Sequence, residues 1–342
     1  MATLSLSGLS VALVDPSDED AIREWYELCR AVAGADYPDD PPLCWVHEVG
    51  SFRHPWPGQV RTVWLARVAG SAVGACTLDL PMLDNVHNAH GDILVAPEHR
   101  RRGIGQALLT HLRSEVTRHG RNRLVSWLTQ PLDPAAPDPA GRFAAAAGAV
   151  PALVQTRRRL DVGTVDPEVL TRLDTEARAC SEGYSLVHWV DATPPQWMDD
   201  IAYLAGRMSI DAPLDDLQWE EEVYDAARVQ GRDACWLGRG LRIITTAAQD
   251  RTGRLVAYTH LIGDVTSPWF AWQGDTIVAP DHRGHRLGML IKVANLKLAR
   301  RERPELRLID TCNANSNPYM VSINEAMGFR PHRRAVDWQL TL

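Results

Sequence analysis

An internal repeat constrains the fold of this chain more than any other feature, because a repeat is one structural unit used twice. Residues 91–100 read GDILVAPEHR, and residues 274–283, which lie 183 positions later, read GDTIVAPDHR. The same displacement aligns Gly105 with Gly288 without a gap. The sequence therefore predicts two copies of one domain, and 342 residues suit two domains of ordinary size.

Each copy predicts the same order of strands and helices. A strand, a helix, a β-hairpin, a further strand, an amphipathic helix and a last strand follow one another. We expect an N-terminal domain at residues 1–162, a linker helix at residues 163–183 and a C-terminal domain at residues 184–342. In the second copy, a polar helix is predicted near residues 219–229.

Composition narrows the function classes. The net charge of -7 argues against non-specific nucleic-acid binding, so a small molecule is the expected partner. No apolar run is long enough for a membrane span, and residues 1–8 lack the build of a signal peptide. We therefore expect a cytoplasmic protein, as a monomer or a homodimer. The six cysteines are scattered without a CxxC pair, which suggests reduced thiols and no zinc site.

Both copies place a basic loop between a strand that ends in Val-Ala-Pro and a helix. In the first copy this segment consists of Arg100, Arg101, Arg102, Gly103, Ile104, Gly105 and Gln106. Glycines let backbone N–H groups approach a diphosphate, and a helix N-terminus adds positive potential. The position between strand and helix, repeated in register, predicts a phosphate site.

The first loop fits the pattern [RQ]-x-x-G-x-[GA] of the GNAT acetyltransferase superfamily, which the chain resembles over nearly its whole length. The resemblance implies an α/β (α+β) fold of two tandem GNAT domains, each a mixed, mostly antiparallel twisted sheet flanked by helices. It also implies acetyl-CoA as the cofactor, with CoA as product. Tandem proteins of this build resemble mycothiol synthase and the acetyltransferases of antibiotic or natural-product pathways.

The second loop departs from this pattern. It consists of Arg283, Gly284, His285, Arg286, Leu287 and Gly288, so that Arg286 stands where the first copy has Gly103. We expect a helical φ at Arg286, which needs no glycine, and a contact between its guanidinium and a CoA phosphate. The departure weakens the prediction of cofactor binding in the second copy.

The segment after the last predicted strand of each copy instead favours cofactor binding in the second copy. Residues 313–329 resemble the GNAT segment in which an Asn begins a helix that lines the CoA arm and ends in Gly-Phe. Asn313 and Asn317 are therefore candidates to contact the pantetheine, and helix capping is the alternative. The first copy has no equivalent polar groups in residues 141–149.

The resemblance also implies where the chemistry takes place. In GNAT enzymes a β-bulge splays the fourth and fifth strands, and the thioester lies between them. Backbone N–H groups near Val95, or near Ile277 and Val278, would then donate to the developing oxyanion. Asp92 and Asp275, three residues before the valines, are candidate general bases, with a solvated or capping carboxylate as the alternative.

Two further positions stay open. Many GNAT enzymes protonate the thiolate with a Tyr four residues before the closing Gly-Phe, where this chain has Asn324 in the second copy and Ala144 in the first. Asn324 is thus a catalytic candidate by position, although the usual acid is absent. The aromatic residues Trp269, Phe270 and Trp272 belong either to the core or to an acceptor pocket.

These observations lead to competing functions. The preferred one is an acetyl-CoA-dependent N-acetyltransferase that acts on a primary amine of a small molecule, in natural-product biosynthesis or resistance, with the second copy as the catalytic one. One alternative is a non-catalytic CoA-thioester-binding or scaffold protein. Another is a mycothiol-synthase-like enzyme that acetylates a thiol precursor.

Overall fold

The computed structural model describes residues 8–342, and residues 1–7, part of the segment that lacks the build of a signal peptide, lie outside the described residues. The first half, up to residue 162, has ten main elements. They are β1 (Leu9–Leu13), α1 (Glu19–Asp36), α2 (Trp45–Arg53), β2 (Gln59–Val68), β3 (Ser71–Pro81), β4 (Asn88–Val95), α3 (Ile104–Arg118), β5 (Arg123–Gln130), α4 (Pro139–Ala146) and β6 (Val150–Asp161).

The second half, from residue 184, repeats this order after the linker helix α5 (Pro167–Cys180). Its elements are β7 (Ser185–Val190), α6 (Met198–Asp211), α7 (Ala226–Gly238), β8 (Leu241–Gln249), β9 (Leu255–Asp264), β10 (Phe270–Val278), α8 (Leu287–Glu302), β11 (Leu308–Ala314), α9 (Pro318–Met327) and β12 (Arg330–Thr341). The predicted α/β class and the repeated order of elements are confirmed.

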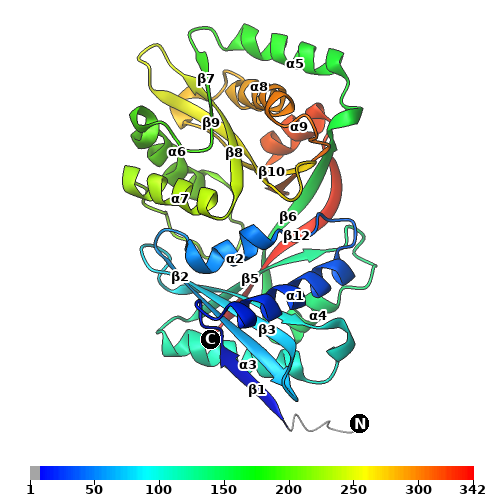
Figure 1. Cartoon of the computed structure of the whole chain (residues 1–342). Coiled ribbons are helices and arrows are strands. Elements are labelled where there is room, and N and C mark those ends of the chain that lie inside the picture. The colour runs from blue at the N-terminus through cyan, green and yellow to red at the C-terminus, as the bar shows by residue number, and fades with distance from the viewer. Residues whose placement is uncertain (1–7) are drawn as a thin grey trace.

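All twelve strands form one sheet, in the order β1-β2-β3-β4-β5-β12-β6-β11-β10-β9-β8-β7. Each half gives its last strand to the other, since β6 pairs with β11 and β12 pairs with β5. The two exchanged strands also pair with each other and cross between the halves (Figure 1). The sequence predicts two sheets, whereas the exchange joins them and leaves no open edge at the junction.

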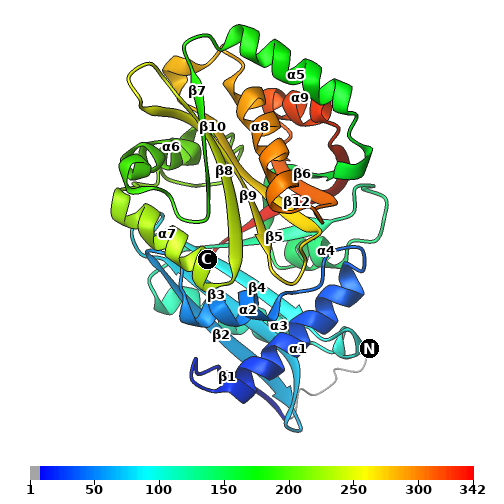
Figure 2. The same ribbon diagram turned by 45° about the horizontal axis from the view of Figure 1, so that its top comes forward.

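The helices cover both faces of the sheet, as Figures 1 and 2 show for α6 and α7 against α8. Successive residues of a strand point to opposite faces. Thr245 and His260 are cross-strand partners and line a cavity beneath α6 and α7. The next pair, Thr246 and Thr259, faces α8, because the Thr246 hydroxyl lies 3.0 Å from the Asn295 side-chain oxygen.

The amphipathic helix predicted after the first loop is confirmed as α3. Its apolar stripe of Ile104, Leu108, Leu112 and Val116 is buried against the sheet. Four fully buried aliphatic side chains contribute on the order of 6–12 kcal/mol of burial free energy. This packing fixes the start of α3, and therefore the loop before it.

The helix predicted near residues 219–229 is wrong. Residues 212–225 form an irregular segment, and α7 begins only at Ala226, where the Asp225 side chain accepts a hydrogen bond from Arg228 N. The segment instead docks on the β3–β4 turn of the first half, since Asn85 accepts a hydrogen bond from Glu220 N (2.7 Å). Contacts with the other half therefore override the local preference for a helix.

A buried ion network ties the halves together at the exchanged strands. Asp310 on β11 is fully buried and accepts hydrogen bonds from Arg157 (2.6 Å) and Arg159 (2.7 Å) of β6. Asp40, from the loop between α1 and α2, pairs with both arginines at 2.7 and 3.1 Å. Burial would raise the pKa of Asp40, but His332 and the two arginines together hold it well below its usual range.

Candidate active sites

The two phosphate loops have the same backbone conformation. Each has two residues with a left-handed φ, namely Arg101 (62°) and Gly103 (86°) in the first loop and Gly284 (86°) and Arg286 (53°) in the second. Each loop thus has one glycine and one arginine at the two left-handed positions, in opposite order. The helical φ expected at Arg286 is wrong, and a left-handed arginine costs about 1–2 kcal/mol.

The first arginine of each loop is used to hold the loop in place. The guanidinium of Arg100 donates to Val95 O (3.1 Å) and pairs with Asp36 (2.7 Å) at the end of α1. Arg283 donates to Val278 O (3.2 Å) in the same way and pairs with an aspartate at the end of α6 (2.7 Å). These two arginines fix the strand end before each loop.

The remaining basic groups differ between the loops. Arg286 pairs with Glu176 of α5 (2.8 Å), and the His285 ring lies 3.3 Å from Cys180 O. Arg101 and Arg102 are exposed, and neither forms an ion pair within residues 8–342. The first loop therefore offers two unpaired guanidinium groups to a phosphate, whereas Arg286 and His285 of the second loop contact α5.

Below each loop, two parallel strands separate. β4 pairs with β5 only at residues 88–90, and β10 pairs with β11 only at residues 270–272. Ala96 N and Ala279 N donate to the neighbouring antiparallel strand, at 3.0 and 2.8 Å. The alternation of a strand therefore directs the N–H groups of Val95 and Val278 into the gap. Both gaps can thus offer a backbone donor to a carbonyl oxygen.

Only the second gap has a β-bulge beside it. Gln273 lies opposite Leu261 and Thr276 lies opposite Thr259, so Gly274 and Asp275 together oppose His260. In the first half, β3 and β4 keep a continuous register from residues 74–79 to residues 95–90. The expected bulge is therefore present in the second half and absent from the described pairing of the first.

The bulge brings Asp275 to the face of the sheet that α6 and α7 cover. The Tyr258 hydroxyl donates to the Asp275 carboxylate at 2.8 Å. Tyr258 is buried, and burial together with Asp275 raises its pKa well above the ordinary value, so Tyr258 remains a donor. Arg232 of α7 and Glu222 of the irregular segment also lie in the electrostatic field of Asp275.

Asp92 has different surroundings in the first half. Its side chain is accessible to solvent although protein atoms crowd around it, and loss of hydration together with Asp79 raises its pKa. Arg61 and Ser126 act in the opposite direction, with the Ser126 hydroxyl at 3.5 Å. Asp92 therefore lacks the tyrosine donor that Asp275 has.

The polar residues after β11 form a small network. Asn317 caps α9, since its side chain accepts a hydrogen bond from Met320 N (3.1 Å). Asn324 is fully buried and donates to Asn313 on β11 (2.5 Å). The Asn324 side-chain oxygen has no hydrogen-bond partner within residues 8–342. Asn313 and Asn317 are both partly accessible, and Asn313 lies on β11, the strand that borders the gap.

A side chain from the helix after the fifth strand of each half packs beside the start of the loop helix. In the second half the position facing Gly288 and Val278 is filled by Ile323, and in the first half Phe143 takes the same place against Gly105. The larger aromatic ring of Phe143 leaves less room beside the first gap. This agrees with the absence of polar groups from the first copy after β5.

The three neighbouring aromatic residues do not line one pocket. Phe270 is buried in the core, and Trp272 lies under the Arg157 guanidinium at 4.6 Å. Trp269 lines a groove at the opposite end of β10 from the bulge. Phe270 therefore belongs to the core, and the acceptor-pocket alternative stays a prediction for Trp269 and Trp272.

The sequence analysis missed the residues around the bulge. Tyr258, His260 and Gln273 occupy positions where the first copy has Ala75, Thr77 and His90. The clearest signal at these positions is the replacement of Ala75 by Tyr258, which brings a hydrogen-bonding side chain to the second copy. The repeat of residues 91–100 and 274–283 does not include these positions, so it does not reveal the difference.

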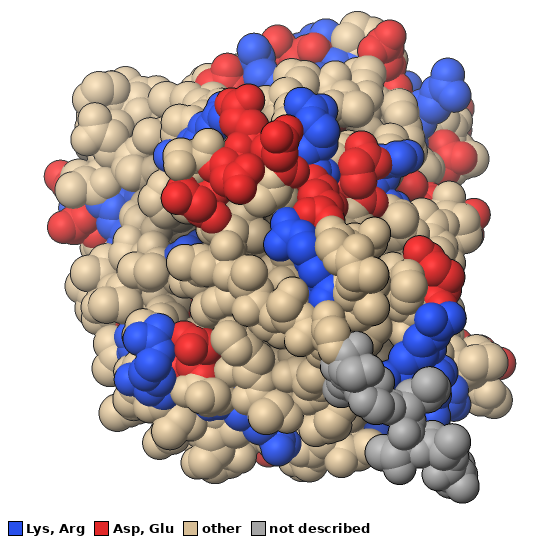
Figure 3. All heavy atoms as spheres, turned by 60° about the horizontal axis from the view of Figure 1, so that its bottom comes forward, with Lys and Arg blue, Asp and Glu red and all other residues tan. Residues whose placement is uncertain are grey.

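Surface charge, helix hydrophobicity and metal-binding side chains bear on further kinds of site. On the face in Figure 3, acidic and basic side chains are interspersed with uncharged surface. Within residues 8–342, no helix has the length and apolar character needed to cross a membrane. In the same part of the chain, His, Cys, Asp and Glu form no group suited to a metal ion, and all six cysteines are free.

Comparisons with known proteins place the chain in a family. Residues 59–143 match the family described as Acetyltransferase (GNAT) domain. The chain is similar to a solved structure described as a tandem GNAT protein from the clavulanic acid biosynthesis pathway, with a TM-score of 0.83 and 34% identity over 97% of this chain and 98% of that one. No curated protein matches the sequence.

A more distant structure has the same fold. It is a GCN5-related N-acetyltransferase from Sphaerobacter thermophilus, with a TM-score of 0.65 and 14% identity over 97% of this chain and 95% of that one. At this identity the likeness concerns the fold alone. Taken with the 34% identical tandem structure, the paired loops and the splayed strands, the matches establish that the chain belongs to the GNAT acetyltransferase superfamily in its tandem form and is an acyltransferase.

Proposed function

We propose that the protein is an acetyl-CoA-dependent N-acetyltransferase that acetylates an amine of a small molecule, and that its second half catalyses the reaction. Residues 1–162 and 184–342 would be the two domains, joined by residues 163–183. The observation that carries the proposal is the bulge at Gly274 and Asp275, which places a tyrosine-supported carboxylate beside the open gap. The 34% identical structure from a natural-product pathway supports a role in such a pathway.

The residues of the second half fit acetyl-CoA. Backbone amides at the start of α8 and Arg286 would hold the diphosphate, and Asn313 would contact the pantetheine. Acetyl-CoA supplies an acetyl group activated as a thioester. The N–H of Val278 would donate to its carbonyl oxygen, and one such donor contributes roughly 10²–10³ in rate.

Asp275 would act as the general base. It accepts the proton that the attacking amine nitrogen loses as the new C–N bond forms, and proton transfer of this kind contributes about 10²–10⁴ in rate. The C–S bond then breaks, and water protonates the thiolate, because Asn324 has no acidic proton. The hydroxide that remains takes up the proton held by Asp275. The reaction yields the amide and CoA, so atoms and charge balance.

The first half would bind CoA without catalysis. Its exposed Arg101 and Arg102 support phosphate binding, while the unbulged β4 and the bulky Phe143 disfavour transfer. A thiol-release assay with acetyl-CoA and a panel of amines tests the assignment. We expect Asp275→Asn to lower turnover at least about 100-fold, and Asp92→Asn to lower it much less. The reverse order would assign catalysis to the first half.

A second candidate is a non-catalytic CoA-thioester sensor. It is favoured by the contacts of Arg286 and His285 with α5 and by the asparagine in place of the usual tyrosine. Calorimetry that detects acetyl-CoA binding, together with no thiol release for any amine, would support this candidate over the enzyme.

A further inference from the structure

We propose that Tyr258 and His260 are positioning residues of the second site, which hold the bulge of β10 and fix Asp275 for proton transfer. The inference rests on the proposed function, in which Asp275 takes the proton from the amine. It adds a layer of residues behind the bulge that the first half does not have.

His260 fills the space behind Gly274. A β-carbon added at Gly274 would lie 2.2 Å from His260 Nε2 and 2.7 Å from its Cδ2. The φ of Gly274 is not in the left-handed region, so the backbone itself would accept alanine. The close approach of the imidazole ring is therefore the reason for glycine at this position.

Tyr258 fixes the other residue of the bulge. Its hydroxyl donates to Asp275 at 2.8 Å, and its ring stacks on His260 with the centroids 5.8 Å apart. A hydrogen bond donated to a carboxylate stabilises the charged form. Because Tyr258 keeps its own proton, the proton of the amine stays on Asp275 and does not pass to the tyrosine.

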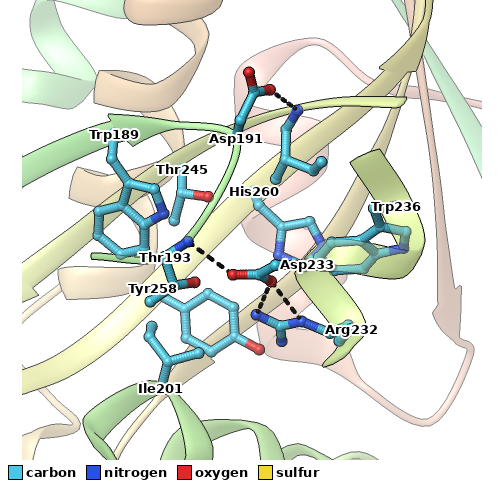
Figure 4. Close-up of a pocket in the computed structure, with 11 residues that line it drawn as sticks. Trp189, Asp191, Thr193, Ile201, Arg232, Asp233, Trp236, Thr245, Tyr258 and His260 are labelled. Carbon is cyan, nitrogen blue, oxygen red and sulfur yellow. Dashed lines mark hydrogen bonds and ion pairs between the residues drawn. The ribbon is translucent and has the colours of Figure 1, made fainter. Parts of the chain in front are cut away.

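A rigid layer supports these two side chains (Figure 4). Arg232 of α7 lies over Trp236 at 4.7 Å and pairs with Asp233 at 3.1 Å. Asp233 in turn accepts a hydrogen bond from Thr193 N (2.7 Å). The polar cavity enclosed here, of about 10 Å³, has room for about one water molecule.

The backbone groups that the bulge frees from the ladder are also satisfied. The Gln273 side chain donates to His260 O (2.7 Å) and to the Thr259 hydroxyl (2.9 Å). The Thr259 hydroxyl donates to Asp275 O at 3.1 Å. Buried polar groups without partners would destabilise the bulge, so these contacts make the irregular backbone the stable one.

The first half has none of this support. Ala75, Thr77 and His90 replace Tyr258, His260 and Gln273, and β3 and β4 pair without interruption. The same Gly-Asp pair therefore lies in a regular strand in one half and in a bulge in the other. The surroundings of the pair, and not the pair itself, determine the bulge.

Five titratable or charged groups face Asp275, from three elements. Tyr258 and His260 come from β9, Arg232 comes from α7, and Glu222 and Tyr224 come from the segment before it. Burial lowers the pKa of His260 to about 4, so the ring is neutral near pH 7. Burial likewise raises the pKa of Tyr224 to about 12 and raises that of Glu222.

The first experiment removes the hydroxyl with Tyr258→Phe. The same amine is used as acceptor for the wild type and for every variant. We expect kcat to fall about tenfold with the Kd for acetyl-CoA unchanged, because the carboxylate loses the hydrogen-bond donor that orients it. Tyr203→Phe, at a half-exposed position of α6, is the matched control and should keep the wild-type kcat.

The second experiment tests the contact between His260 and Gly274 with a double-mutant cycle. Gly274→Ala should lower kcat at least tenfold, and adding His260→Ala should recover part of the loss, because the ring that collides with the new methyl group is gone. Additive effects of the two changes, together with an unchanged kcat in Tyr258→Phe, would overturn the inference.

These outcomes separate the inference from the proposed function. If Asp275→Asn leaves turnover intact, the catalytic assignment fails whatever Tyr258 does. If no amine is acetylated, the ¹³C resonance of the Asp275 carboxyl group provides an activity-free readout. It should move in Tyr258→Phe and stay in place in Tyr203→Phe, and a resonance unaffected by both would refute the support of Asp275 by Tyr258.

Discussion

The phosphate loops of the two halves and the strands before them show opposite relations between sequence and backbone conformation. Their phosphate loops differ in sequence, with glycine and arginine exchanged between two left-handed positions, yet the backbone is the same. The strands just before these loops share the Gly-Asp and Val-Ala-Pro residues, yet one strand is regular and the other is bulged. The backbone conformation of the loop and the regularity of the strand therefore depend on the neighbouring elements and not on the local sequence alone.

For the loops, the helix that follows and the arginine that holds the strand end are common to both halves. For the strands, the support differs, since β9 carries Tyr258 and His260 where β3 carries Ala75 and Thr77. A duplicated fold can thus keep the same loop backbone in both copies while only one copy has the bulge.

The largest expected effect concerns cofactor binding by each half. If both loops bind acetyl-CoA, the wild-type protein binds two equivalents in calorimetry, and either Gly105→Arg or Gly288→Arg removes one of them. Each arginine side chain would fill the space beside Val95 or Val278, where the glycines now have no β-carbon. A wild-type stoichiometry of one would show that the loops share a backbone without sharing a ligand.

The next effect concerns the junction of the halves. Asp310→Ala leaves Arg157 and Arg159 buried with only Asp40 as a partner, so we expect the free energy of unfolding in urea to fall by about 3–5 kcal/mol. Glu27→Gln, which removes an exposed pair with Arg30, should change it by less than about 1 kcal/mol. Equal effects of the two changes would mean that the network does not hold the halves together.

A buried lysine gives a third test. Lys292 of α8 is buried, its ammonium group has no hydrogen-bond partner within residues 8–342, and it lies 5.4 Å from the Phe329 ring. The first half has Leu109 at this position. Burial lowers the pKa of Lys292 from 10.5 to about 7.

The lowered pKa of Lys292 determines how its effect on the free energy of unfolding changes with pH. Below pH 7 the folded protein must bury the charged lysine, and this penalty disappears as the pH rises from 7 towards 10.5. Lys292→Leu should therefore raise the free energy of unfolding at pH 7 by about 2–4 kcal/mol, with a gain that shrinks towards pH 10. A gain that does not depend on pH would assign the effect to packing alone.

The smallest effect concerns the left-handed residues of the loops. Gly103→Arg gives the first loop the residue that the second already carries at this position, so we expect a loss of about 1 kcal/mol in the free energy of unfolding. Thermal unfolding at constant protein concentration measures this. No loss would mean that the loop backbone tolerates arginine at either left-handed position without strain.

The sequence predicts much of the fold, because the strand and helix signals are local and occur twice. The stripe of α3 and the order of elements followed from periodicity, and Gly91–Arg100 located the strand and loop of each copy. The strand exchange was not predictable, since β6 and β12 have no local feature that selects β11 or β5. That choice depends on contacts such as Arg157 with Asp310, which are 153 residues apart.

The site was predictable where its residues belong to a local motif. Asp275 and the loop residues were found through the motif, and the supporting Tyr258 and His260 were not. An alignment without a gap cannot detect that Leu261 pairs with Gln273, whereas Leu78 pairs with the glycine one position further along. The bulge arises between strands, so it has no signature within either one.

The exchange of β6 and β12 also has a consequence for biosynthesis. β12 leaves the ribosome after every other described strand, and it is the neighbour that β5 needs. The first half therefore emerges with an unprotected strand edge and stays incomplete until translation has passed residue 341. Neither copy could be expressed alone as a finished unit, so the two copies of the duplication remain bound to one polypeptide while their sites diverge.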